Sequence, residues 1–182
     1  DWPDLDVHEP SSFPLAVTQT FHPHIGVLLN ITPDHLDRYD KKMSNYINSK
    51  VRLVKNMGSK DYFIYYTGDP ISGPEAKQRS MEAYRVEISL DHEAITSAHF
   101  DGKKMIFQFG KKSFKIAQSD TTLKGTHNLI NTMAAVSAAY LAKVSDTKIR
   151  EGLKTFKNAP HRLESIADIN GVEFVNDSKA TN

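Results

Sequence analysis

The sequence of 182 residues contains no cysteine, which excludes disulfide bonds and thiolate metal sites. It also contains no apolar run of the roughly 18 residues that a membrane-spanning helix needs. The opening residues, DWPDLDVHEP, lack the basic region and apolar stretch of a secretory signal. We therefore expect a cytoplasmic protein that does not act in a membrane.

The sequence has no excess of either charge, since 23 lysines and arginines are balanced by 22 aspartates and glutamates. Such a balance gives no bulk attraction to nucleic acid or to a membrane surface. Apolar residues make up 39% of the chain and charged residues 25%, which is typical of a globular protein. The length suits one domain, or one domain with a short appendage.

The first half of the chain alternates strand and helix patterns. The near-continuous apolar run at 24–30 is typical of a strand that is covered on both faces, as in a parallel sheet. Thr32 followed by Pro33 predicts that a helix begins directly after it. Apolar residues at helical spacing predict a further helix over 42–57, and residues 61–66 predict the next strand.

The second half is expected to combine hairpins with two helices. Short alternating patterns at 81–118 predict paired strands, and residues 126–144 and 146–156 have helical spacing. Two strand patterns then flank the turn Asn170-Gly171. The expected class is α/β, with a mostly parallel sheet flanked by helices and a small antiparallel insertion.

The character of the sequence changes at NAPHRLE, after the second of these helices. The strands that follow have no helix of their own to cover them. We therefore expect residues 1–158 to form one domain, and residues 159–182 to form a linker and the first strands of another. A short helix is also expected to begin at Ser11 or Ser12, close to Pro14.

Polar side chains follow the strand predicted at 24–30. Ligands of open parallel sheets bind beyond the carboxyl ends of the strands, where Asn30 and His35 are expected. A helix N-terminus at this point favours a neutral imidazole, which could bind a metal or a cation that is bound to phosphate. The alternative is that Asp34 only complements the helix dipole and that His35 is solvated.

Lys50 falls within the apolar stripe of the helix predicted over 42–57, between Ile47 and Leu53. A lysine at such a position either extends along apolar surface to reach water or is partly desolvated, so that the neutral amine is favoured. A neutral amine could act as a base or a nucleophile, or react with carbon dioxide to give a carbamate. Both readings of Lys50 remain open.

Glu9 follows a possible strand end at Val7 and precedes Ser11 and Ser12. One carboxylate and two hydroxyls could complete a site for a hard cation of the magnesium kind, which uses few carboxylates together with water and phosphate oxygens. The alternative is an ordinary group of helix N-cap residues.

Asn128 and Asn131 lie one helical turn apart in GTHNLIN, a spacing that suits reading the edge of a planar base. The alternative is that Thr126 caps the helix and that both asparagines are surface residues. Further along, Arg162 could stack on an adenine or bind a phosphate, or could be an ordinary surface arginine.

Together, six segments resemble the Mur ligase family, and within it the branch that adds D-glutamate: EPSSF, NITPDHLDRY, YINSKVRL, GTHNLIN, HRLE and NDSKATN. The resemblance spans essentially the whole chain. It implies ATP-dependent amide formation in the synthesis of peptidoglycan precursors, with two magnesium ions. ATP would phosphorylate the carboxylate of UDP-N-acetylmuramoyl-L-alanine, and the amine of D-glutamate would attack the acyl phosphate. The full-length protein is expected to be a monomer.

The resemblance also implies roles for individual residues. The expected magnesium ligands are Glu9, His35 and Lys50 as a carbamate. The expected catalytic residues are Lys50, His35 and Lys179. The residues expected to contact the nucleotide are Asn128, Asn131, Arg162 and Asp177. The residues expected to bind the substrates are Ser11, Ser12, Asn30 and Thr181.

The pattern G-x-x-x-x-G-K-[ST] does not occur, so the phosphate-binding loop of the family is absent from the sequence. We therefore expect an incomplete central ATP-binding domain that does not complete the reaction alone. Three alternatives remain open. They are a related ligase with another amino-acid substrate, a nucleotide-binding or regulatory module without catalysis, and a carbohydrate- or partner-binding domain of the same fold.

Overall fold

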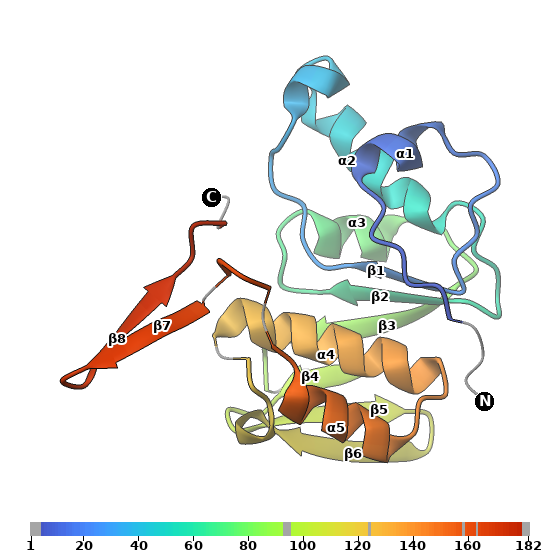
Figure 1. The fold of residues 1–182 in the computed structure, drawn as a ribbon. Coiled ribbons are helices and arrows are strands. Elements are labelled where there is room, and N and C mark those ends of the chain that lie inside the picture. Colours follow the sequence, from blue (N-terminus) through green and yellow to red (C-terminus); the bar gives the residue numbers. More distant parts are fainter. Residues whose placement is uncertain (1–4, 93–95, 124, 158, 163, 180–182) are drawn as a thin grey trace.

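The protein, described from a computed structural model, forms three layers, with helices on both faces of a six-stranded sheet (Figure 1). The structure describes residues 5–92, 96–123, 125–157, 159–162 and 164–179. No helix within these ranges is long and apolar enough to cross a membrane. The α/β class that the sequence predicts is confirmed.

The order of the strands in the sheet follows their order in the chain. The strands are β1 (Ile25–Leu28), β2 (Tyr62–Tyr66), β3 (Tyr84–Ser89), β4 (Ala98–Phe100), β5 (Lys104–Phe109) and β6 (Lys112–Ala117). The pairs from β1 to β4 are parallel, and β4, β5 and β6 pair antiparallel. The expected antiparallel part therefore forms one edge of the same sheet.

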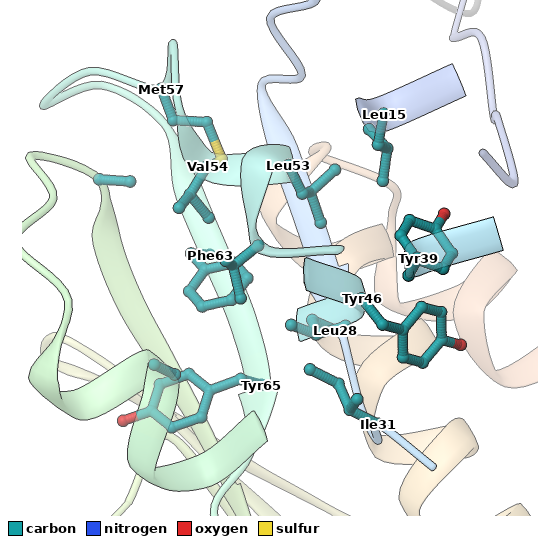
Figure 2. Close-up of a cluster of buried hydrophobic side chains, with 13 residues drawn as sticks. Leu15, Leu28, Ile31, Tyr39, Tyr46, Leu53, Val54, Met57, Phe63 and Tyr65 are labelled. Carbon is teal, nitrogen blue, oxygen red and sulfur yellow. The ribbon is translucent and has the colours of Figure 1, made fainter. Parts of the chain in front are cut away.

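Side chains of β2 alternate between the two faces of the sheet, as a pleated strand requires. Phe63 and Tyr65 enter one apolar cluster, while Ile64 enters the other, and all three are fully buried. Figure 2 shows the first cluster, in which Phe63 lies next to Val54 of the helical layer. That layer contains α1 (Ser12–Val17), η1 (Leu36–Tyr39), α2 (Met43–Val51), η2 (Arg52–Val54) and α3 (Ser72–Gln78).

The other face is covered by α4 (Thr126–Leu141) and α5 (Asp146–Thr155). Leu129, Met133 and Val136 form the buried stripe of α4, and Ile149 joins the same cluster from α5. Both helices are predicted from the spacing of their apolar residues, and both predictions are confirmed. Figure 1 shows that α4 begins at the edge of the sheet toward which β1 and β2 point.

Three details of the predicted first half are wrong. No helix begins at Pro33: the first helical turn after β1 is η1, because His35 has a left-handed backbone with φ of 48° that a continuous helix does not tolerate. Residues 5–11, all described, contain no strand, and Val7 is exposed. The helix predicted over 42–57 is α-helical only to Val51 and continues as the 3-10 turn η2.

Helix α3 is not predicted from the sequence, because Thr67 to Pro70 indicate only a turn. The carboxylate of Asp69 explains the helix. It accepts hydrogen bonds from the backbone N–H of Ile71 at 3.1 Å and of Ser72 at 2.6 Å, and so satisfies free donors of the first turn. Pro74 lies within that turn, where its missing N–H costs no helical hydrogen bond.

The chain ends in a separate two-stranded sheet, formed by β7 (Glu164–Ile169) and β8 (Val172–Asn176). The predicted turn Asn170-Gly171 is confirmed. Its φ angles of 54° and 79° are the left-handed values that a tight hairpin turn requires. Figure 1 shows the hairpin extending away from the three layers. A domain boundary at residue 158 stays a prediction.

Candidate active site

Three short helical segments meet on one face of the sheet through a group of hydroxyls. The hydroxyl of Tyr39, in η1, donates to Oγ of Ser12 in α1 at 2.7 Å and lies 3.5 Å from Oγ of Ser49 in α2. Ser49 Oγ in turn donates to the backbone carbonyl of Ser12. Tyr39 and Ser49 are buried, so these contacts join η1, α1 and α2 inside an otherwise apolar cluster.

The expected magnesium ligands lie beside these same segments. Glu9 is exposed and precedes α1, and His35 is exposed and directly precedes η1. Lys50 lies in the last turn of α2, and its Nζ is 5.2 Å from the centroid of the Tyr46 ring. His35 Nε2 is 3.5 Å from the carboxylate of Asp34, and both side chains are more than half exposed.

Whether these side chains fit magnesium depends on the donors that they offer. Within the described ranges, no three histidine, aspartate or glutamate side chains are grouped closely enough to hold a metal by themselves. Mg²⁺, however, keeps several waters and binds phosphate oxygens, so one or two protein ligands are enough. The carboxylate of Glu9 offers the oxygen donors that Mg²⁺ prefers, and the exposed imidazole of His35 is available as a second ligand beside water and phosphate oxygens. Lys50 would be a ligand only as a carbamate.

The residues expected to bind the substrates differ in how available they are. Asn30 follows β1 and is exposed, and Ser11 is the exposed residue before α1. The hydroxyl of Ser12 is already engaged by Tyr39. The segment after β1 is held in place by Ser72 Oγ, which donates to the carbonyl of Leu29 at 3.2 Å.

The residues expected to bind the nucleotide come from two places. Asn128 and Asn131 lie in the first turns of α4, with Asn128 half-buried and Asn131 exposed. They therefore lie at the carboxyl edge of the parallel strands but on the face of the sheet opposite α2. This is the edge at which sheets of this kind bind ligands.

Arg162, Asp177 and Lys179 lie at the open end of the β7–β8 hairpin, and all three side chains are exposed. The backbone N–H of Lys179 donates to the carbonyl of His161 at 3.1 Å, so the segments before β7 and after β8 lie side by side. The structure thus brings Arg162 and Asp177 to one end of the hairpin. Thr181 lies outside the described residues.

A groove of about 820 Å³ lies on the helical layer. Tyr39 and Ser49 contribute to its wall, together with Arg79, but none of the described residues nominated from the sequence lines it. A smaller hollow of about 210 Å³ includes Glu9 and Pro10. The nominated residues therefore do not share one enclosed pocket.

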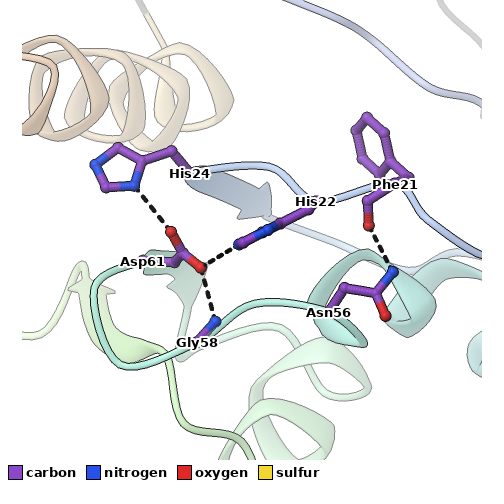
Figure 3. Close-up of polar contacts among 6 residues, drawn as sticks. All are labelled: Phe21, His22, His24, Asn56, Gly58 and Asp61. Carbon is purple, nitrogen blue, oxygen red and sulfur yellow. Dashed lines mark hydrogen bonds and ion pairs between the residues drawn. The ribbon is translucent and has the colours of Figure 1, made fainter.

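A second polar cluster joins the segments that precede β1 and β2 (Figure 3). The buried carboxylate of Asp61 is 2.5 Å from Nε2 of His22 and 2.8 Å from Nδ1 of His24, and it accepts the backbone N–H of Gly58 at 2.7 Å. Burial raises the pKa of Asp61, but the hydrogen bonds with His22, Gly58 and His24 outweigh it and lower the pKa to about 2. The cluster lies at the amino ends of the strands, away from the candidate site.

Sequence reasoning missed Tyr39 and Ser49. A signal for Tyr39 exists: Tyr39 and Tyr46 are seven residues apart and flank the start of α2, and their rings pack at 5.2 Å in the cluster of Figure 2. A serine next to Lys50 carries no comparable signal, because burial of a single hydroxyl depends on contacts that are distant in the sequence.

The family is shown by the sequence profile of the Mur ligase middle domain, which matches residues 5–139. The chain belongs to the Mur ligase family. It is 38% identical over 179 residues to the UDP-N-acetylmuramoylalanine–D-glutamate ligase of Christiangramia forsetii, and 42% identical over 180 residues to that of Cytophaga hutchinsonii. Each alignment covers 98% of this chain and 40% of the relative. The chain thus spans about 40% of the length of the curated relatives it matches.

Solved structures of Mur ligases have the same fold. MurF from Acinetobacter baumannii has a TM-score of 0.64 and 20% identity, over 91% of this chain and 35% of that protein. MurF from Thermotoga maritima, solved in complex with ADP, has a TM-score of 0.58 and 18% identity, over 85% of this chain and 35% of that protein. The expectation of a fold like that of a Mur ligase central domain is confirmed.

Proposed function

We propose that this chain forms most of the central domain of an ATP-dependent ligase that adds D-glutamate to UDP-N-acetylmuramoyl-L-alanine during the synthesis of peptidoglycan precursors. The observation that carries the proposal is the identity of 38% and 42% to two relatives with this name, over 98% of the chain. Other Mur ligases with solved structures are much less similar, at 20% and 18% identity for the two MurF proteins.

The proposed chemistry has two steps. A carboxylate oxygen of the L-alanyl precursor attacks the γ-phosphorus of ATP, and ADP leaves. The amine of D-glutamate then attacks the carbonyl carbon of the acyl phosphate, loses a proton, and phosphate leaves. Magnesium, when bound, would offset the negative charge of the transferring phosphoryl group.

The residues of this chain would hold and orient the reacting groups. Glu9 and His35 present an exposed carboxylate and imidazole beside α1 and η1. Lys50, after reaction of its neutral amine with carbon dioxide, would present a carbamate from α2. Ser11 and Asn30 are exposed beside the same elements and would contact the precursor. Orientation of this kind supplies most of the rate in phosphoryl transfer.

The nucleotide would bind at the edge where α4 begins. Asn128 and Asn131 would recognise the adenine, while Arg162 and Asp177 at the end of the hairpin would contact the rest of the nucleotide. Lys179 and Thr181 would help to bind the amino-acid substrate, at the start of a further domain.

The proposal divides the chain into residues 1–158, as central domain, and 159–182, as linker and first strands of the next domain. It also takes the full-length protein to be a cytoplasmic monomer that binds neither nucleic acid nor membrane.

The experiment uses the full-length protein with ATP, Mg²⁺ and the L-alanyl nucleotide precursor, and measures phosphate release. D-glutamate, L-glutamate and L-lysine are supplied in turn, and omission of the precursor gives the background rate. We expect release only with D-glutamate. Release with L-lysine would favour a related ligase, and ATP binding without release in any mixture would favour a nucleotide-binding module.

A further inference from the structure

We propose that Tyr39, Ser12 and Ser49 are positioning residues. Their hydrogen bonds fix the positions of the three proposed magnesium ligands relative to one another. This inference rests on the proposed function. It concerns hydroxyls that act through the segments which they join. The Ser12 hydroxyl accepts from Tyr39 and keeps its own O–H for the substrate contact expected from the sequence.

Each member of this hydroxyl triad is close in sequence to one proposed ligand. Ser12 lies three residues after Glu9, and Tyr39 lies four residues after His35. Ser49 directly precedes Lys50. The hydroxyl contacts at 2.7 Å and 3.5 Å therefore connect α1 to η1 and α2, which come later in the chain, and the proposed site needs all three segments.

The segments need such an anchor, because α1 has six residues and η1 only four. Helices this short are not stable without tertiary contacts. Neither segment has a side-chain cap hydrogen bond among the described residues. In addition, the residues on either side of η1, His35 and Asp40, have left-handed φ angles of 48° and 55°, which cost conformational energy.

The triad is also costly to interrupt. Tyr39 is 8% exposed and Ser49 4% exposed, so water does not readily replace a lost partner. If the Tyr39 hydroxyl is removed, the Ser12 hydroxyl loses its donor next to an apolar cluster. The backbone can then relax by moving η1 or α1, and either movement shifts a proposed ligand.

The test compares Tyr39→Phe with Tyr46→Phe in the full-length protein. Each variant deletes one phenolic hydroxyl from the same pair of packed rings, but only Tyr39 belongs to the triad. The first measurement is hydrogen exchange of the backbone amides of α1 and η1, without substrate. The second is the Mg²⁺ concentration that gives half-maximal phosphate release with D-glutamate.

We expect Tyr39→Phe to speed exchange in α1 and η1 and to raise the half-maximal Mg²⁺ concentration by about fivefold to tenfold, since the loss of one buried hydrogen bond is of that order. At saturating Mg²⁺ its maximal rate should stay within about twofold of the unmodified protein. Tyr46→Phe should change neither quantity. If Tyr39→Phe does not fold, Ser49→Ala removes the donor to Ser12 from the other side and is expected to have the same effects.

Unchanged exchange and an unchanged Mg²⁺ requirement in Tyr39→Phe or Ser49→Ala would overturn the inference. The same holds if Tyr46→Phe has an equal effect, because the hydroxyls would then contribute only to packing. If the unmodified protein releases no phosphate with D-glutamate, the proposed function fails. Exchange in α1 and η1, measured without substrate, would still decide whether the triad holds these segments.

Discussion

The ammonium group of Lys50 lies 5.2 Å from the centroid of the Tyr46 ring, one helical turn earlier on α2. Tyr46 is buried and Lys50 is half-buried, so the stem of the lysine covers apolar surface while its charge stays beside the ring face. A contact of this kind requires little from Lys50 for folding.

We expect Lys50→Ala to lower the free energy of unfolding by no more than about 1 kcal/mol, the size of a partly exposed cation–π contact. Leu53→Ala, nearby and buried, should cost about 2–5 kcal/mol. Urea unfolding of both variants checks this. An equal loss in the two would show that Lys50 is mainly a structural residue.

Asp61 should make stability depend on acid pH. Its pKa is lowered from 3.8 to about 2 in the folded protein. Its stabilising contribution is therefore fully present above the unfolded pKa and is lost as the pH falls from about 4 through 2.

Asp61→Asn should cost about 1–3 kcal/mol at pH 7, because the hydrogen bonds with His22 and His24 lose their charged acceptor. Between pH 4 and 2 its stability should fall less steeply than that of the unmodified protein. Urea unfolding at pH 7, 4, 3 and 2 measures both effects, with Glu151→Gln as an exposed control. If the stability of Asp61→Asn falls between pH 4 and 2 as steeply as that of the unmodified protein, the proposed role of Asp61 is wrong.

Arg52 should be needed to hold the end of α1. Its Nε donates to the carbonyl of Leu15 at 2.9 Å and its Nη2 to that of Thr18 at 2.6 Å. Lysine lacks the planar guanidinium whose separate nitrogens donate to both carbonyls. Arg52→Lys should therefore lower the free energy of unfolding by about 1–2 kcal/mol and speed amide exchange in α1. Arg38→Lys, an exposed position, is the control. The role of Arg52 would be wrong if both variants were equally stable.

Asn131 tests the proposed nucleotide site, since its exposed side chain lies near the start of α4. Asn131→Ala in the full-length protein should raise KM for ATP by about fivefold to tenfold, the value of one lost hydrogen bond, and leave kcat nearly unchanged. Ala135→Asn, an exposed position about one turn along α4, should leave KM unchanged. A normal KM for ATP in Asn131→Ala would remove this residue from the site.

Most of the fold could be predicted because its signals are local. The apolar run before Asn30 and the stripes of α4 and α5 are patterns within single segments. Helix α3 could not be predicted, since it depends on the carboxylate of Asp69 reaching across a turn. The helix expected at Pro33 is wrong because His35 has a left-handed backbone, which the local pattern of residues does not indicate.

The candidate site was only partly predictable. The motifs predicted Glu9, His35 and Lys50 as separate site residues. The contacts between their segments are made by Tyr39 and Ser49, which no motif indicated. Such contacts join positions distant in the chain, and a single sequence does not predict which hydroxyls form hydrogen bonds with one another.

The most direct test of the proposed ligase is phosphate release by the full-length protein and its Lys50→Ala variant, with ATP, Mg²⁺, the L-alanyl nucleotide precursor and D-glutamate. We predict that the variant loses at least about 100-fold in rate, as expected when a group that positions charge is removed, and that a short-chain carboxylate partly restores the rate. Lys50→Ala with a normal rate would contradict it.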